Sequence, residues 1–176
     1  MSVRPAVAHD ADFLWRILLE AYNWNGEQRF TAEQLAAEPH AARYVVGWPR
    51  KDDFGIIAET DTGEPIGAVW ARHLPESEPG YGFIAPDVPE LTLGLLPEHR
   101  GRGHGRALME ALIQAAAEGV APVGRLSLSV EDGNPAVHLY TALGFTRVGR
   151  NGNSDTMVLD VQTCPTPLKN PQFPRP

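Results

Sequence analysis

The sequence predicts one domain of the α/β class, in which strands and helices alternate along the chain. Its 176 residues suit a single domain with a sizeable core. Short apolar runs with strand periodicity are interspersed with segments whose apolar residues recur at helical spacing. One apolar run, residues 90–96, leads directly into a glycine-rich turn that opens a helix. We expect residues 1–161 to form this domain and residues 162–176 to be a proline-rich tail.

Two helices are expected in the first part of the chain. The first begins at Asp10 or Asp12, because apolar residues then recur every three or four positions. The second begins after Thr31, whose side chain suits an N-cap and which has Gln34 at the capping-box position. Pro39 is expected to limit this helix.

Strands are expected where apolar residues alternate or run together between turn residues. A turn at residues 60–63 predicts a hairpin. Prolines and glycines are too frequent in residues 75–89 for regular structure. This segment, called here the proline-rich loop, is either a wall of an acceptor site or a packed surface loop. The expected strands are residues 3–7, 54–60, 65–73, 90–96, 125–130, 145–148 and 156–161.

Two further helices are expected in the second part. One runs from Gly103 to about Gly119. The other is capped by Asn134, has Pro135 at its first position and ends at Gly144. Gly94, in the middle of a strand, indicates a bulge or a close approach of another backbone.

Composition excludes several classes of protein. A formal net charge of −7 speaks against general nucleic-acid binding, which requires a basic surface. Cys164 is the only cysteine, so no disulfide forms within the chain. The histidines show no metal-ligand spacing, and we expect no metal. Because no signal peptide or membrane span is recognisable, we expect a cytoplasmic protein that does not bind membranes.

The turn at residues 100–106, called here the glycine-arginine turn, predicts a phosphate site. Its glycines let backbone N–H groups approach an anion at the positive end of the following helix, and its arginines add full charges. The sequence lacks the lysine of a nucleotide-hydrolase loop and the third glycine of a dinucleotide fingerprint. The candidate phosphate ligands are Arg100, Gly101, Arg102, Gly103, His104, Gly105 and Arg106.

The spacing Arg100-x-x-Gly103-x-Gly105 resembles the acyl-CoA pyrophosphate loop of the GNAT superfamily of N-acetyltransferases. A second motif, residues 134–145, resembles the segment that follows the fifth strand in that family. The resemblance covers about residues 3–161. It implies a mixed, mostly antiparallel central sheet that is flanked by helices and splayed at the fourth strand.

The resemblance also implies roles for individual residues. The backbones of Leu93 and Leu95 would pair with the pantetheine arm of acetyl-CoA, and Asn134 would contact the same arm or only cap its helix. Tyr140 would protonate the departing thiolate, or it is a core residue beside Phe145. No metal is implied.

A base is also needed, because an alkylamine is neutral only about once in two thousand molecules at pH 7. Glu90 is the candidate base, acting through water, and Asp87 is the reserve. A solvated strand-end glutamate is the alternative for Glu90.

Two functions remain open at this point. The first is acetyl transfer from acetyl-CoA to a small-molecule or peptide amine, and the second is a non-catalytic acyl-CoA sensor. The sequence leaves open whether the chain forms a homodimer. By the resemblance, aromatic residues of the first helices and the proline-rich loop would line the acceptor site, or they only pack: Tyr22, Trp24, Phe30, Tyr81 and Phe83.

Overall fold

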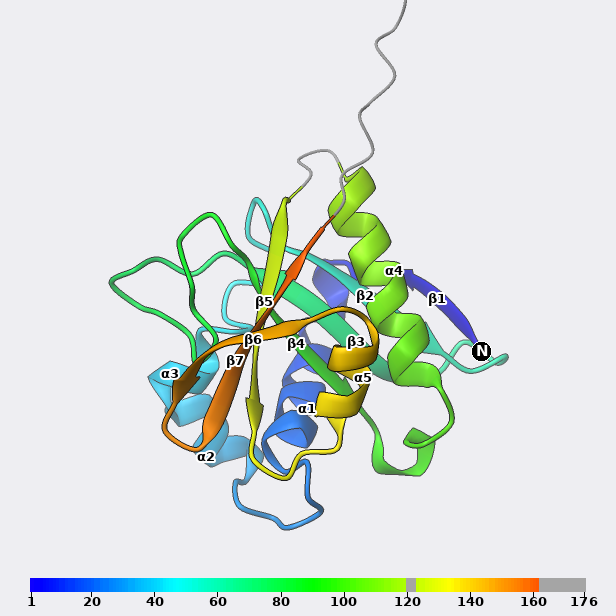
Figure 1. Ribbon diagram of the computed structural model, residues 1–176. Helices are drawn as coiled ribbons and strands as arrows, with labels where there is room; N and C mark the ends of the chain where they lie inside the picture. The colour runs from blue at the N-terminus through cyan, green and yellow to red at the C-terminus, as the bar shows by residue number, and fades with distance from the viewer. Residues whose placement is uncertain (120–122, 162–176) are drawn as a thin grey trace, which may run out of the picture.

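The structure, a computed structural model, describes residues 1–119 and 123–161. These residues form a seven-stranded sheet in the order β1-β2-β3-β4-β5-β7-β6 (Figure 1). Neighbouring strands are antiparallel except for β4 and β5, which are parallel. The mixed, mostly antiparallel sheet is therefore confirmed. Its strands are β1 (Ser2–Pro5), β2 (Phe54–Glu59), β3 (Pro65–Arg72), β4 (Glu90–Leu95), β5 (Arg125–Glu131), β6 (Thr146–Asn151) and β7 (Ser154–Asp160).

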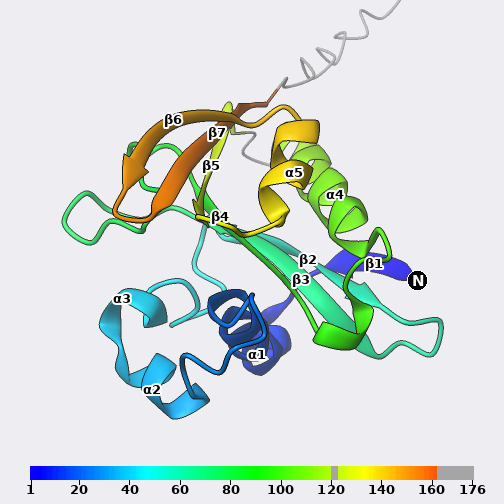
Figure 2. The same cartoon turned by 60° about the horizontal axis from the view of Figure 1, so that its bottom comes forward.

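Helices cover both faces of this sheet (Figure 2). On one side lie α1 (Ala11–Tyr22), α2 (Ala32–Ala37) and α3 (Pro39–Ala42), and on the other lie α4 (His104–Glu118) and α5 (Ala136–Ala142). Two short 3-10 helices, η1 (Ala8–Asp10) and η2 (Pro97–His99), precede α1 and the glycine-arginine turn.

Local signals explain most helix boundaries. The Thr31 hydroxyl accepts a hydrogen bond from the Gln34 amide at 3.2 Å, and the Gln34 side chain accepts one from the Thr31 amide at 2.9 Å. Pro39 separates α2 from a third helix that the sequence did not predict, because a proline also suits the first position of a helix. Asn134 accepts a hydrogen bond from the Ala136 amide at 3.0 Å, but α5 begins one residue later than expected, with Pro135 at the N-cap position.

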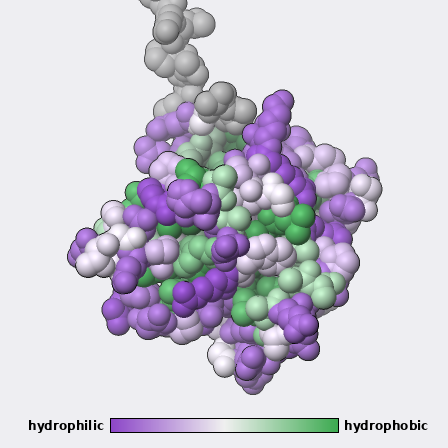
Figure 3. Space-filling model, turned by 180° about the vertical axis from the view of Figure 1, so that it is seen from behind, coloured by the Kyte–Doolittle hydropathy of each residue, from purple (hydrophilic) through white to green (hydrophobic). Residues whose placement is uncertain are grey.

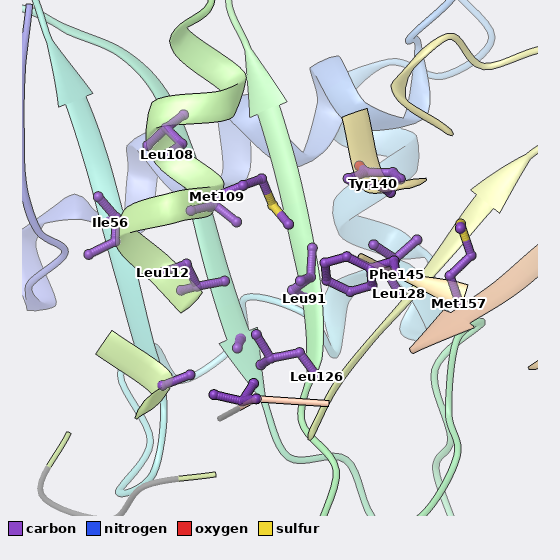
Figure 4. Packing of buried hydrophobic residues seen from close by; sticks show 14 of the residues in the cluster. Ile56, Leu91, Leu108, Met109, Leu112, Leu126, Leu128, Tyr140, Phe145 and Met157 are labelled. Atoms are coloured by element: carbon purple, nitrogen blue, oxygen red, sulfur yellow. The ribbon is translucent and has the colours of Figure 1, made fainter. Parts of the chain in front are cut away.

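The core has one apolar cluster on each face of the sheet. The cluster beneath α4 contains Leu108, Met109 and Leu112, which meet Leu91 and Leu126 of the sheet (Figure 4). The cluster on the opposite face joins α1 and α3 to the other side of β2 and β3. The two clusters fix the sheet between its helices, so that β4 is held from both faces.

The two edges of β4 are paired very differently. Toward β3, all six residues from Glu90 to Leu95 have a partner in register. Toward β5, the ladder contains only the pair Glu90 and Ser127. The two central strands therefore separate after their first residues, which confirms the expected splay.

Gly94 does not form a bulge, because it stays in register with Ala68. The alternative expectation, a close approach, describes the structure: a Cβ added at Gly94 would lie 2.8 Å from the Ile17 carbonyl oxygen of α1. The absent side chain lets α1 pack directly on the strand.

The face shown in Figure 3 is largely hydrophilic, with hydrophobic side chains in small separate areas. Among the described helices, none is both long and apolar enough to cross a membrane. The expected tail at residues 162–176 lies outside the described residues.

Candidate active site

A cleft of about 340 Å³ opens where β4 and β5 separate. The C-terminal part of α1, the loop after it and the start of α5 close its sides. Its polar lining combines two glutamates, an arginine, tyrosines and small hydroxyl and amide groups. These residues are Tyr22, Arg29, Tyr44, Tyr81, Glu90, Thr92, Ser129, Glu131, Asn134, Tyr140, Asn153 and Ser154.

Glu90 lies in this cleft and is only 4 % exposed. Its Oε1 atom accepts hydrogen bonds from the Tyr44 hydroxyl and the Gly82 amide, both at 2.8 Å. No described residue hydrogen-bonds its buried Oε2 atom. Burial raises the pKa of Glu90 to about 7, against the opposing effect of these two hydrogen bonds. The structure thus rejects the alternative of a solvated strand-end glutamate.

The proline-rich loop holds the Glu90 carboxyl group in place. The Tyr81 amide donates to the Tyr44 hydroxyl at 2.8 Å, next to the Gly82 amide that binds Glu90 itself. A Cβ at Gly80 would lie 2.0 Å from Glu90 Oε2, and one at Gly82 would lie 2.5 Å from the Leu128 carbonyl carbon. Glycine is therefore required where the loop crosses Glu90 and β5.

Tyr140 comes from the middle of α5 and is 7 % exposed. Its ring packs against Phe145 at a centroid distance of 5.9 Å (Figure 4). The same side chain lines the cleft, and burial raises its pKa. Tyr140 therefore belongs both to the core and to the cleft wall, so the two sequence interpretations do not exclude one another.

The expected pantetheine contacts lie at different places. Leu93 and Asn134 line the cleft from its two sides. Leu95 lies beyond it, and its carbonyl oxygen accepts a hydrogen bond from Arg100 Nε at 3.1 Å.

The glycine-arginine turn joins η2 to α4. Gly101 and Gly103 have φ angles of +71° and +84°, which strongly favour glycine, and a Cβ at either would meet no atom within 4 Å. The space above this backbone is therefore open beside the N-terminus of α4. Arg102 and Arg106 are exposed there, and His104 is partly exposed at the first position of the helix.

Arg100 is placed differently from the other arginines of the turn. Its guanidinium group forms an ion pair with Glu20 at 2.8 Å and donates to the Trp24 carbonyl oxygen at 3.1 Å. The side chain thus ties the turn to α1. Arg100 therefore has contacts that position the turn, and its direct contact with a phosphate stays a prediction.

Four of the five aromatic residues suggested for an acceptor wall line the cleft: Tyr22, Trp24, Phe30 and Tyr81. Phe83 packs instead against the core cluster beside α1. Asp87 is exposed and is not part of the cleft lining. Of the two candidate bases, only Glu90 reaches the cleft.

The sequence interpretation missed seven polar residues of the cleft: Arg29, Tyr44, Thr92, Ser129, Glu131, Asn153 and Ser154. Tyr44 follows a helix that was itself not predicted, and Glu131 is the last residue of its strand. Arg29 lies in an irregular connection between α1 and α2. Periodicity carries no signal at such positions, because their side chains meet only through tertiary contacts.

Residues 12–145 match the model of the acetyltransferase (GNAT) family. The chain belongs to this family. The match includes β4, β5 and α5, which line the cleft, and the glycine-arginine turn.

Curated relatives share this region at moderate identity. The mycothiol acetyltransferase of Amycolatopsis mediterranei is 33% identical over 152 residues, which are 84% of this chain and 46% of that protein. The mycothiol acetyltransferase of Cellulomonas flavigena is 27% identical over 175 residues, 97% of this chain and 45% of that protein. The chain thus spans less than half the length of these relatives.

Solved structures share the fold of this GNAT chain. The ribosomal-protein-alanine N-acetyltransferase of Brucella melitensis superposes with a TM-score of 0.63 at 21% identity, covering 91% of this chain and 99% of that one. The spermidine N-acetyltransferase of Vibrio cholerae, in complex with CoA and spermine, gives a TM-score of 0.60 at 20% identity, covering 92% and 96%.

Proposed function

We propose that this GNAT chain transfers the acetyl group of acetyl-CoA to a primary amine by direct attack. The observation that carries the proposal is the meeting of Glu90 and Tyr140 in one cleft, between strands that separate. One is a carboxyl group whose pKa lies near neutrality, and the other is a phenol without a described hydrogen-bond partner.

The two groups supply complementary proton transfers. The Glu90 carboxylate receives a proton from the amine, directly or through water, and the amine nitrogen attacks the thioester carbonyl carbon. The C–N bond forms and the C–S bond breaks, and Tyr140 donates its proton to the departing thiolate. The remaining extra proton on the nitrogen passes through water to the Tyr140 phenolate, which leaves a neutral amide, free CoA thiol and protonated Glu90. A base whose pKa is near the working pH is the most effective kind.

Proton transfer from Tyr140 to the thiolate is less favourable than proton transfer to Glu90. A phenol has an ordinary pKa of about 10 and a thiol about 8.5, so placement beside the sulfur has to compensate for this difference. Burial raises the pKa of Tyr140 further, which keeps its proton in place until the thiolate forms.

The remaining residues would bind acetyl-CoA. Backbone N–H groups at Gly101, Gly103 and Gly105 would meet the pyrophosphate at the N-terminus of α4, with Arg102, His104 and Arg106 adding charge. Leu93 and Asn134 would flank the pantetheine arm. The Leu95 amide would face the thioester from the strand, and Arg100 would hold the turn against α1. The residues 1–161 would act as one domain.

A panel of small amines and peptides with acetyl-CoA tests this function. Acetylated product, detected by mass spectrometry together with free CoA, supports the enzyme. Binding of acetyl-CoA with no product from any amine would instead identify the alternative, an acyl-CoA sensor. With a substrate in hand, single-turnover transfer by Tyr140→Phe should be slower by about 10²–10⁴ at unchanged CoA affinity.

The acetyl-CoA site has its own test. Gly103→Val places a branched side chain in the open space above the turn and should abolish measurable binding in calorimetry. Gly63→Val is the matched control, because Gly63 has a φ of +81°, equally open surroundings and a place in a distant hairpin. Equal affinities in the two folded variants would exclude the turn as the pyrophosphate site.

A further inference from the structure

The charges of the cleft lining are few, and all but one are paired. Among the described residues that line the cleft, Arg29, Glu90 and Glu131 are the only charged ones. Residues 120–122 and 162–176 contain no aspartate or glutamate, so the parts of the chain outside the described residues add no acidic side chain. Among the described residues, a positively charged acceptor inside the cleft can therefore meet a carboxyl group only at Glu90 or Glu131.

Glu131 is fully engaged by its neighbours. Arg29 binds it with both terminal nitrogens, Nη1 to Oε1 at 2.8 Å and Nη2 to Oε2 at 2.9 Å. The Trp24 indole N–H donates to Oε2 at 2.7 Å, and the Asn153 amide donates to Oε1 at 3.1 Å. The hydrogen bond from Arg29 is the largest of the effects that lower the pKa of Glu131. A bidentate pair of this kind is strong and directional.

Among the described residues, Glu90 is therefore the one carboxyl group of the cleft that forms no ion pair. The amine that is to be acetylated needs this group. A second ammonium group on the same molecule would find Glu131 already neutralised and Arg29 carrying a like charge beside it. Like charges brought together in a binding site are a general means of excluding the wrong ligand.

The other polar groups of the lining are neutral. The Tyr22 hydroxyl is buried and no described residue hydrogen-bonds it. Ser129, Asn153 and Ser154 add hydroxyl and amide groups on the opposite side of the cleft. Such groups recognise hydroxyl and amide functions of a ligand and do not compensate a positive charge.

We propose that the acceptor carries a single amine on an uncharged body rich in hydroxyl or amide groups, and that the Arg29–Glu131 pair excludes polyamines. This inference rests on the proposed acetyltransferase function and refines its substrate class. Arg29 is then the residue that determines specificity, because without it Glu131 would offer a second anionic site.

Two compounds of equal length provide the test. Acetyl transfer to 6-amino-1-hexanol and to 1,6-diaminohexane is compared on the unaltered chain, with glucosamine and spermidine as a second, larger pair. We expect kcat/KM to be at least about tenfold higher for the compound with one amine, although the diamine offers two reactive ends. A diamine or polyamine used equally well or better would overturn the proposal and leave the acetyltransferase function standing.

The variant Arg29→Gln should reverse this preference, because it frees the Glu131 carboxylate for the second ammonium group. The double variant Arg29→Gln with Glu131→Gln is the matched control, and it should lose the gained diamine activity. Melting temperatures verify that each variant is folded. An Arg29→Gln protein that is folded and keeps the original preference would contradict the role of the pair. Absence of transfer to every amine tested would overturn the function and this inference together.

Discussion

Arg72 and Glu90 are cross-strand partners in β3 and β4, and both side chains are buried, at 0% and 4% exposure. Their surroundings differ. Asp53 binds the Arg72 guanidinium with N–O distances of 2.6–3.2 Å, and the carbonyl oxygens of Arg43 and Val46 accept from its remaining nitrogen. Glu90 faces no cation at contact distance, and one of its oxygens has no described hydrogen-bond partner.

The difference in surroundings distinguishes a charge that stabilises the fold from a carboxyl group that can exchange a proton near neutral pH. Arg72 is compensated on every side and fastens β3 to the segment after α3. Glu90 is held by neutral donors, so its carboxyl group stays in place while its proton affinity rises. Perturbed carboxyl groups of this kind are typical of catalytic sites, whereas paired ones are typical of structural networks.

Removing the Glu90 carboxylate should have the largest effect. In Glu90→Gln we expect acetyl transfer to fall by about 10²–10⁴, because the base is lost while the shape of the side chain is kept. Steady-state kinetics with any accepted amine measures it. Asp87→Asn is the matched control and should keep the original rate, since Asp87 is exposed and outside the cleft. If the Asp87 variant were the slow one, the base assignment would be wrong.

Breaking the ion pair between Arg72 and Asp53 should lower the stability of the fold. Asp53→Asn leaves the buried Arg72 charge without its anion and should lower the free energy of unfolding by about 3–5 kcal/mol. Urea denaturation measures this loss, and Asp52→Asn, at the exposed neighbouring position, provides the control. An unchanged free energy of unfolding in Asp53→Asn would mean that the buried Arg72 charge does not need the Asp53 carboxylate.

Stability should also depend on pH through Glu90. Its folded-state pKa of about 7 lies above the ordinary 4.5, so the folded protein binds the proton more tightly. The stabilisation is complete below pH 4.5 and is lost as the pH rises to about 7, by about 3 kcal/mol. The difference in unfolding free energy between the wild type and Glu90→Gln should change by this amount between pH 4.5 and pH 8. A difference that stays constant would show that Glu90 has an ordinary pKa.

The comparison also shows where sequence reasoning succeeds. The order of elements follows from local patterns, and the capping box at Thr31 forms as expected. The splay of β4 from β5 was expected from the family resemblance. The absence of a side chain at Gly94 leaves room for Ile17 of α1 to pack against the strand. Short-range physical rules are sufficient for the order of elements and for the capping box, whereas the splay was expected only from the resemblance.

Other features depend on contacts between distant segments. Arg100 was expected at a phosphate because of its neighbours in sequence, yet Glu20 and Trp24 lie 80 and 76 positions away. Tyr44 reaches Glu90 across 46 positions. Such partners carry no periodic or motif signal, so the burial of Glu90 and the hydrogen bonds that hold it could be found only in the folded chain.

Tyr44 allows the smallest and most specific test of the poised carboxyl group. Its hydroxyl donates to Glu90 and favours the charged form, so Tyr44→Phe should raise the pKa of Glu90 further. Hydrogen bonds to charged groups contribute about 1.5–3 kcal/mol, which corresponds to about one or two pH units. The groups that face Glu90 besides Tyr44 are the Gly82 amide and, at longer range, Arg43, and both remain in the variant.

The acidic limb of the kcat/KM profile of Tyr44→Phe should therefore move to higher pH, while the rate at high pH recovers. Carbon NMR of labelled glutamate, with Glu90→Gln to assign the resonance, follows the same titration without any substrate. A resonance that titrates at the same pH in the wild type and in Tyr44→Phe would show that the hydroxyl does not tune the base, and a rate reduced equally at every pH would assign Tyr44 a purely structural role.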